Sequence, residues 1–463
     1  MKNHILFSQK AFKTLSNMEH HAQSIEDALI GGLSYKLKPG ASYVTNRRSV
    51  SFMASGGNQY SSTGVKVMRF NLTADQWLDP SSFRVAFQLN NKTLTTQLTV
   101  TRKAVKPLHW NPAILFRRAR LIAGGQVIED IDNFNRLSLM ITALKPEDEQ
   151  LDIANEGFGS FDNKNDGVLT RVDEDMDERK SYRESDFNES GVIEVSRRVM
   201  FKPMLGMFNQ DRLIPLRYCP LQIELELVNN SADCVFNGVI ETHTYHSDWD
   251  ITDIQCKCDL LTLDNSLENE YASHLLSGKS LPINFNTWNH TNQATNGDKD
   301  FSCHISRSLT RLKSVCLSLT GKGDEWYKEC NNFYHPMVGQ GGEMYDFSSE
   351  HQVWIQIGSM LIPEYPVNGV SEAYYHLKKA VGHPFHIIGR WFRTRKYIIG
   401  FDCEKIAGAG FTGISTKNGD LLTVNFRNAK QNGYDNTEPQ RMYCALNYDA
   451  ILNIKDQGVE LLD

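Results

Sequence analysis

Histidine and aspartate side chains, which ligate zinc and related ions, gather in one short segment, HTYHSDWD at residues 243–250. In a strand, His246, Asp248 and Asp250 share one face, and His243 precedes them. No second cluster with metal-ligand spacing follows, so the pattern is unspecific. We interpret the segment as an exposed junction between domains and predict no metal site in it.

A glycine-rich motif, GAGFTG at residues 408–413, matches the dinucleotide-binding pattern G-x-G-x-x-G. That pattern requires a helix after the glycines, because the helix N-terminus holds the pyrophosphate. Here the next residues, ISTKNGDLLTVNF, predict a turn and a strand. We therefore predict a structural turn at Gly408 to Gly413 and no bound cofactor.

Other catalytic patterns are absent from the sequence. There is no G-x-S-x-G nucleophile motif, and no Cys or Ser stands in a recognised nucleophile motif. The carboxylates Glu129, Asp130 and Asp132 fit a strand end followed by a helix N-terminus, where acidic residues are favourable. The chain is therefore predicted not to be an enzyme, and no catalytic residue is assigned.

Two basic stretches suggest a binding surface. Arg117, Arg118 and Arg120 lie in a predicted strand, and residues 390–397 interleave arginines with aromatic side chains. Such interleaving occurs in single-strand nucleic-acid binders and in subunit interfaces alike. The formal net charge of -6 disfavours a nucleic-acid role, so we expect subunit contacts and assign Arg390, Trp391 and Arg393 to an assembly interface.

Composition sets the size and class of the protein. A length of 463 residues favours two domains, and a hydrophobic content of 40% is enough to build two cores. No apolar run is long enough to span a bilayer, and residues 5–7 are too short for a signal-peptide core. Nine cysteines cannot all pair, which favours a reduced intracellular setting.

Alternating apolar and polar residues predict many antiparallel strands. Residues 83–89 and 221–227 show the pattern most clearly. Many strands with few helices favour sandwiches or jelly rolls over a parallel sheet. Further strands are predicted at 65–72, 94–100, 192–199, 251–263, 281–288, 309–319, 353–360, 397–402, 421–426 and 442–454.

One order of elements occurs twice. Residues 112–144 and 351–381 each predict a strand, a glycine turn, a short strand and a helix, and each block follows an alternating strand. The repetition indicates a duplicated β-domain. We expect domains at 50–249 and 250–463, meeting near residues 247–251. Because no Pro- or Gly-rich linker marks this boundary, we expect a rigid junction.

Two segments differ from the strand-rich parts of the chain: one precedes the first domain, and the other is a loop within it. Residues 1–49 contain a predicted amphipathic helix and a linker, and the helix either covers its own domain or docks on another partner. The helix carries an apolar stripe from Phe7 to Leu29, and its assembly-interface candidates are Phe7, Phe12, Leu15, Met18, Ile25 and Leu29. Residues 146–190 are a long polar insertion, either a solvated loop or a projecting tower on an assembly surface.

Several segments carry a resemblance to a known family. They resemble the double jelly-roll major capsid proteins of the Polinton/Maverick, adintovirus and polinton-like virus group, over about residues 50–455. The most specific segment is RRARLIAGGQVIEDIDNFNRL. The segments are SFMASGGNQYSSTGVKVMRFNL, DQWLDPSSFRVAFQL, FRRARLIAGGQVIEDIDNFNRL, LPINFNTWNHTNQ and YIIGFDCEKIAGAGFTGISTKNGDLLTVNF.

The resemblance implies an all-β fold of two tandem jelly-roll domains, each an eight-stranded β-sandwich, with short helices and the N-terminal amphipathic helix. It implies a homotrimer of pseudo-hexagonal outline that tiles an icosahedral shell of a double-stranded DNA virus or virus-like element. Expected partners are neighbouring capsomers, penton and minor capsid proteins and an internal membrane. The expected location is the virion, assembled inside the host cell. The alternatives are a two-jelly-roll hydrolase of the peptide-N-glycosidase type and a glycan-binding attachment protein.

Overall fold

The computed structural model describes most of the chain from residue 43 onward. The N-terminal candidates from Phe7 to Leu29 lie outside the described residues, as do Arg390, Trp391, Arg393, the strand predicted at 94–100 and most of the polar insertion. The described residues are 43–92, 103–159, 193, 195–240, 243–321, 333, 351–385, 387, 392, 396–406, 408, 410–417, 421–429 and 439–463.

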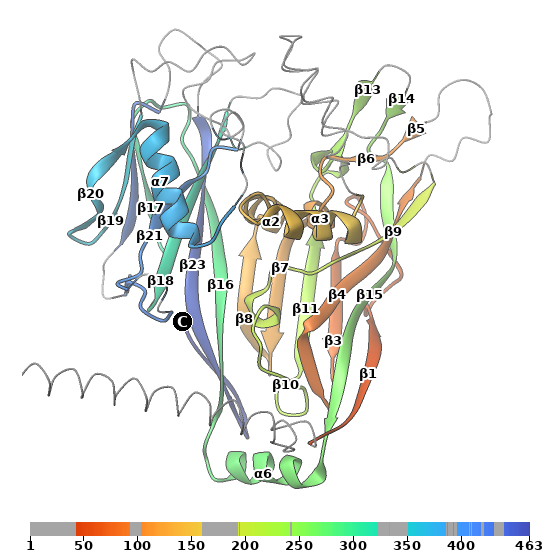
Figure 1. The fold of residues 1–463 in the computed structure, drawn as a ribbon. Helices are drawn as coiled ribbons and strands as arrows, with labels where there is room; N and C mark the ends of the chain where they lie inside the picture. Colours follow the sequence, from red (N-terminus) through yellow and green to blue (C-terminus); the bar gives the residue numbers. More distant parts are fainter. Residues whose placement is uncertain are drawn as a thin grey trace, which may run out of the picture.

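The first half of the chain forms a sandwich of two antiparallel sheets (Figure 1). One sheet has the strand order β1-β15-β4-β9, with the short strands β2 and β10 added to β15 and β4. The facing sheet has the order β3-β11-β7-β8. The bounds are β1 (Val44–Met53), β2 (Gln59–Tyr60), β3 (Val67–Leu72), β4 (Trp77–Asn91), β7 (Phe116–Ala123), β8 (Gln126–Asp132), β9 (Ser196–Phe201), β10 (Ile214–Pro215), β11 (Leu221–Leu227) and β15 (Trp249–Leu263).

The second half forms a sandwich with the same plan. One sheet has the order β16-β23-β18-β21, with β24 added to β23, and the facing sheet has the order β17-β22-β19-β20. The bounds are β16 (Leu281–Ala294), β17 (Phe301–Ile305), β18 (Leu312–Gly321), β19 (Gln352–Ile357), β20 (Met360–Asn368), β21 (Ile399–Asp402), β22 (Leu422–Arg427), β23 (Pro439–Lys455) and β24 (Gly458–Leu462).

The two sandwiches match strand for strand. Numbering the eight main strands of each in chain order gives sheets 1-8-3-6 and 2-7-4-5 in both halves. This is the jelly-roll arrangement, so the fold is two tandem jelly rolls. A helix follows the fifth strand of each sandwich: α2 (Phe134–Ala143) after β8, and α7 (Gly369–Val381) after β20. The predicted repeat of strand, glycine turn, strand and helix is therefore confirmed.

Alternating side chains build the cores as the sequence indicates. In β11, four alternate residues from Leu221 to Leu227 are buried, while the residues between them are partly exposed. In β4, Phe83 stacks on Phe208 with ring centroids 4.0 Å apart. Eight cysteines of the described residues are buried and free, and burial raises the pKa of each thiol for which a shift is resolved, as at Cys219 to about 12. They act as small apolar residues.

The connection between the sandwiches differs from the expected boundary near residue 249. β15 pairs with β1 from Val44 to Met53 and with β4, so it completes the first sandwich. The chain crosses over through α6 (Asn265–Leu276), which Asp264 caps by accepting a hydrogen bond from the Ser266 amide. The first sandwich also begins earlier than residue 50, because β1 starts at Val44.

The polar insertion also differs from a continuous loop. It begins with α3 (Glu147–Glu156), whose first turn contains Glu147, Asp148 and Glu149. Acidic side chains there favour a helix because they face the positive end of the helix dipole. Ala154 and Phe158 are buried against the first sandwich, so this part of the insertion belongs to the folded domain.

Short elements complete the described chain. β14 pairs with β13 in the antiparallel sense and with β5 in the parallel sense, and β12 pairs with β6. None of the helices in the described part of the chain is long and apolar enough to cross a membrane. The bounds are β5 (Lys103–Ala104), β6 (Lys106–Pro107), β12 (Val235–Phe236), β13 (Gly238–Ile240), β14 (His243–Tyr245), and the 3-10 helices η1 (Pro112–Leu115), η4 (Gly206–Phe208) and η5 (Ser231–Asp233).

Candidate functional site

The junction between the two sandwiches concentrates buried polar groups. It is formed by β8 and η4 of the first sandwich and β16 of the second, which pack side by side. At Gly206 the two backbones approach closely: a Cβ atom there would lie 2.1 Å from the Asn286 carbonyl oxygen. Only glycine allows this approach without displacing the chain. Phe208, stacked on Phe83, anchors η4 in the first core.

Glu129 of β8 joins three elements at the junction. Its carboxylate accepts hydrogen bonds from the Gly206 amide (2.7 Å), the Met207 amide (2.9 Å) and the Thr287 hydroxyl of β16. Glu129 is 2% exposed. Burial raises the pKa of this carboxyl group, and the hydrogen bonds from Thr287, Met207 and Gly206 oppose that rise. Glu129 therefore links the sandwiches through directional bonds shielded from water.

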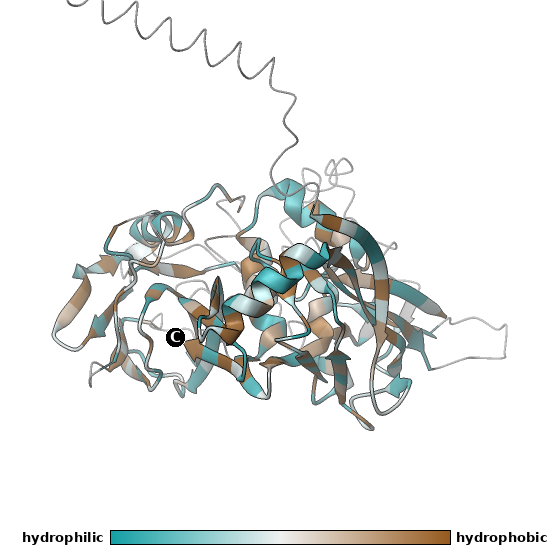
Figure 2. Ribbon diagram, turned by 90° about the horizontal axis from the view of Figure 1, so that it is seen from below, coloured by the Kyte–Doolittle hydropathy of each residue, from teal (hydrophilic) through white to brown (hydrophobic). Residues whose placement is uncertain are grey.

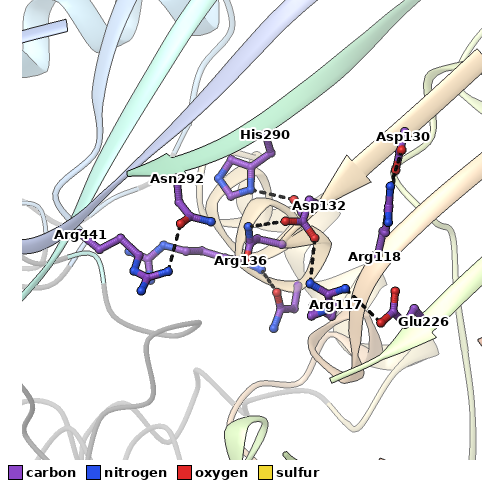
Figure 3. Close-up of polar contacts among 11 residues, drawn as sticks. Arg117, Arg118, Asp130, Asp132, Arg136, Glu226, His290, Asn292 and Arg441 are labelled. Carbon is purple, nitrogen blue, oxygen red and sulfur yellow. Dashed lines mark hydrogen bonds and ion pairs between the residues drawn. The ribbon is translucent and has the colours of Figure 1, made fainter. Parts of the chain in front are cut away.

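His290 makes a second link between the sandwiches. Its Nδ1 donates to the Asp132 carbonyl oxygen at 3.1 Å, and burial lowers the pKa of the imidazole to about 4. His290 is thus neutral at pH 7. Figure 3 shows His290 beside Asp132, whose carboxylate pairs with Arg117 at 3.3 Å; Arg117 also reaches Glu226 at 3.0 Å.

Arg136 of α2 extends into the second sandwich. The side chain is buried, its guanidinium lies 4.2 Å from the Tyr443 ring centroid and 5.0 Å from that of Phe333, and it donates to the Leu319 carbonyl at 3.3 Å. A guanidinium stacked between aromatic rings is favourable even when desolvated. The helix α2 therefore acts together with β8 to fix the orientation of the second sandwich relative to the first.

The basic stretch of β7 is neutralised on its own sheet. Arg118 pairs with Asp130 through two short hydrogen bonds, and Arg120 pairs with Glu224 at 3.1 Å (Figure 3 shows the first pair). Arg69 of β3 shares Glu224. These pairs are partly exposed, so each contributes little to stability. The arginines of this stretch are paired with carboxylates, and this pairing disfavours phosphate binding by the stretch.

Two members of the candidate metal cluster, His246 and Asp250, make other contacts. Asp250 is buried and accepts hydrogen bonds from Gln59 and from Asn90, at 2.9 Å for the latter. His246 Nδ1 accepts the Asp248 amide at 3.1 Å, which is a local turn contact. Among the residues that the structure describes, no three His, Cys, Asp or Glu side chains gather as a metal site.

The glycine motif forms a turn, as the sequence predicts. Gly408, Gly410 and Phe411 have φ values of +73°, +63° and +54°. Gly413 then pairs with Glu404, and the next residue, Ile414, pairs with Leu312 of β18. No helix follows in residues 410–417, so the helix N-terminus that would hold a pyrophosphate does not form.

A cleft of about 390 Å³ lies beside α2 and α3. It contains the ion pairs Arg84–Glu156 (3.0 Å) and Lys145–Glu149 (3.2 Å), together with Lys202. Its lining residues include no cysteine or histidine, and no serine–histidine pair can therefore form within that lining. The lining therefore lacks the cysteine–histidine and serine–histidine pairs that activate many nucleophiles.

The residues of the junction were not recognised from the sequence as a site. Glu129 was assigned to a strand end near a helix N-terminus, whereas its partners are Gly206, Met207 and Thr287. Glu129 and the adjoining Ile128 are both buried, so β8 is covered on two faces, and only the structure shows this. The proposed interface residues Arg390, Trp391 and Arg393 lie outside the described residues.

Comparison with known proteins supports the fold. No protein-family model and no curated protein matches the sequence. The structure is similar to PBCV-1 VP54, as fitted into a cryo-EM reconstruction of the virophage Sputnik, with a TM-score of 0.59, 11% identity, and coverage of 92% of this chain and 98% of VP54.

Two other solved structures are similar over comparable lengths. The cryo-EM structure of the Sputnik virophage has a TM-score of 0.57 and 10% identity, covering 92% of this chain and 90% of that one. The Faustovirus major capsid protein has a TM-score of 0.56 and 8% identity, covering 91% and 92%. At these identities the likeness establishes the double jelly-roll fold over both halves of the chain.

Proposed function

We propose that this chain is a major capsid protein that assembles as a homotrimeric, pseudo-hexameric capsomer in an icosahedral shell. The observation that carries the proposal is the pair of sandwiches with identical strand order, joined side by side through Glu129, His290 and Arg136. The structural likeness to the Faustovirus major capsid protein, which extends over nearly the whole of both chains, supports it.

The physical argument is one of symmetry. Three copies of a chain with two similar sandwiches place six similar units around one axis, which gives a near-hexagonal tile from one gene. A tile packs with its neighbours only if the angle between its units is fixed. The buried bonds of Glu129 and the insertion of Arg136 fix that angle within each chain.

The partners follow from this role. The chain would contact copies of itself within the trimer, then neighbouring capsomers, penton and minor capsid proteins. The segment 1–30, with its apolar stripe, would dock on a neighbouring capsomer, a minor protein or an internal membrane on the inner side of the shell. The remainder of the polar insertion to residue 190 would form an outward tower. The Polinton/Maverick assignment rests on the sequence resemblance.

Size-exclusion chromatography with light scattering tests the trimer. The proposal predicts a species of about 158 kDa, three times the chain mass of 52.7 kDa. A single monomeric species at micromolar concentration contradicts it. Assembly of the purified protein into closed shells would support the full role. Recovery of the protein in virions made inside the host cell would establish it.

A further inference from the structure

The cleft beside α2 and α3 contains polar groups that the fold leaves without partners. Residues of α2 at helical spacing, from Ser138 to Thr142, line one wall, and one face of α3, from Glu149 to Glu156, lines another. Figure 1 shows both helices at the upper part of the first sandwich and α6 at the bottom. Figure 2, seen from below, shows hydrophilic residues along most of α6. The cleft therefore lies apart from the crossover between the sandwiches.

Three cations meet in this cleft, and one of them has no carboxylate partner. β9 pairs with β4 through Phe201 and Val85, so the next residues along the two strands, Lys202 and Arg84, are neighbours. Arg84 and Lys145 each form an ion pair with a glutamate of α3. No carboxylate in the described part of the chain pairs with Lys202. Because like charges on neighbouring strands repel each other, Lys202 leaves an excess positive charge in the cleft.

Lys202 is also partly buried. Burial lowers the pKa of its ammonium group, and the charges of Arg84 and Lys145 lower that pKa further, whereas Asp79 and Glu156 act in the opposite direction. Both of these acids already pair with arginines, at 3.2 Å and 3.0 Å respectively. A partly buried charge without a counter-ion is costly. The cleft therefore favours a ligand that brings negative charge to Lys202.

A second, independent observation also points to a ligand. Ser138 is 3% exposed, and its hydroxyl group makes no hydrogen bond with the residues that the structure describes. Buried hydroxyl groups normally have a partner. Because Ser138 lines the cleft, a ligand oxygen at the floor could accept the hydrogen bond that this hydroxyl does not otherwise make. Asp152, the acid of the lining that forms no ion pair with described residues, is exposed, so solvent and salt screen its repulsion of an anion.

We propose that the cleft binds a small oxyanion, a phosphate or carboxylate group, through the ammonium group of Lys202 and the hydroxyl group of Ser138. Arg84 and Lys145 add positive charge around it. The ligand is small, because the cleft has a volume of about 390 Å³. The bound anion connects the end of β9 with α2 and neutralises the excess charge. Since α3 lines the same cleft, the anion also stabilises the start of the polar insertion.

Calorimetric titration of the full chain with inorganic phosphate, and separately with succinate, at constant ionic strength tests the site. Lys202→Gln should weaken binding by roughly tenfold or more, because a hydrogen bond to a charged group is lost. Ser138→Ala should weaken binding less and leave the melting temperature unchanged or higher, since it removes a hydroxyl group without a partner. Lys405→Gln is the matched control, because Lys405 is an exposed lysine of the second sandwich. Binding of only one of the two anions identifies the oxyanion that the cleft selects.

The pKa of Lys202 provides a readout that does not depend on the folding of the glutamine variant. Lysines methylated with carbon-13 give NMR signals that report each pKa, and Lys202→Arg, which keeps the positive charge, assigns the signal of Lys202. A bound anion should raise this pKa, because negative charge favours the ammonium form. Wild-type protein that binds neither anion at millimolar concentration, or Lys202→Gln protein with wild-type affinity, would overturn the proposal. Either result would leave the proposed capsid role standing, since the cleft lies within one chain.

Discussion

Replacement of Gly206 by alanine tests the junction with the smallest possible change. Gly206 lies in η4, and its backbone faces Asn286 of β16. An alanine Cβ atom would lie 2.1 Å from the Asn286 carbonyl oxygen and 2.9 Å from the Thr287 Cβ atom. Ordinary contacts begin at 3.4 Å, so the two backbones must separate by more than 1 Å.

The expected cost follows from the bonds that this separation disturbs. The steric overlap alone costs about 1–3 kcal/mol, as for other overpacked interiors. Separation also moves Thr287 away from Glu129, and a buried polar group that loses its partner costs about 1–3 kcal/mol. We therefore expect Gly206→Ala to lower the free energy of unfolding by roughly 2–6 kcal/mol.

Urea unfolding followed by tryptophan fluorescence measures this loss. Gly64→Ala is the control, because its Cβ atom would meet only the Ser61 hydroxyl at 2.9 Å, and that side chain can rotate away. We expect Gly64→Ala to leave the unfolding midpoint nearly unchanged. If Gly206→Ala is as stable as the control variant, the close contact between the sandwiches does not exist as described.

Three further predictions concern Glu129, the glycine turn and the N-terminal segment. Burial raises the pKa of Glu129 above its ordinary value of 4.5, so its contribution to stability is complete below pH 4.5 and is lost as pH rises through the folded pKa. The stability of the wild type relative to Glu129→Gln should therefore fall as pH rises above 4.5, and a difference that grows with pH would contradict the argument. Gly410→Val should lower the free energy of unfolding by about 1–3 kcal/mol because the φ of +63° disfavours a β-branched residue, and micromolar binding of NAD or ATP in calorimetry would show that the turn has another role. Deletion of residues 1–30 should leave trimers intact in light scattering and reduce the yield of complete particles, and a normal particle yield would exclude an assembly role for the segment.

Strands with one buried face were predictable because their alternation of apolar and polar residues is visible in the local sequence. β11 and β4 carry alternating apolar residues, and both were found. β1 was missed because eight of its ten residues are exposed, so no apolar alternation marks it. Its place is set by pairing with β15, whose partner residues lie more than two hundred positions away. Such pairing has no signal in the local sequence.

The predicted domain boundary near residue 249 differs from the observed crossover for a similar reason. The polar segment HSDWD resembles a junction, yet the strand that begins at Trp249 returns to the first sheet between β1 and β4. Which sheet a strand joins depends on tertiary pairing. The connection α6 was not recognised, although Asp264 is a favourable helix cap before Asn265.

The junction shows the limit of sequence reasoning most clearly. Glu129 was noticed as one of three carboxylates, and a local explanation was available for it. Its hydrogen-bond partners are 77, 78 and 158 residues away, so only the fold brings them together. The repeated block was predictable because it depends on the order of elements, which the sequence records directly.

Electron microscopy of the purified protein in negative stain tests the central claim most directly. If three copies place six similar sandwiches around one axis, class averages should show a particle of hexagonal outline with three-fold symmetry. Particles with only two lobes, of the size of one chain, would contradict the capsomer account even though the double jelly-roll fold would stand.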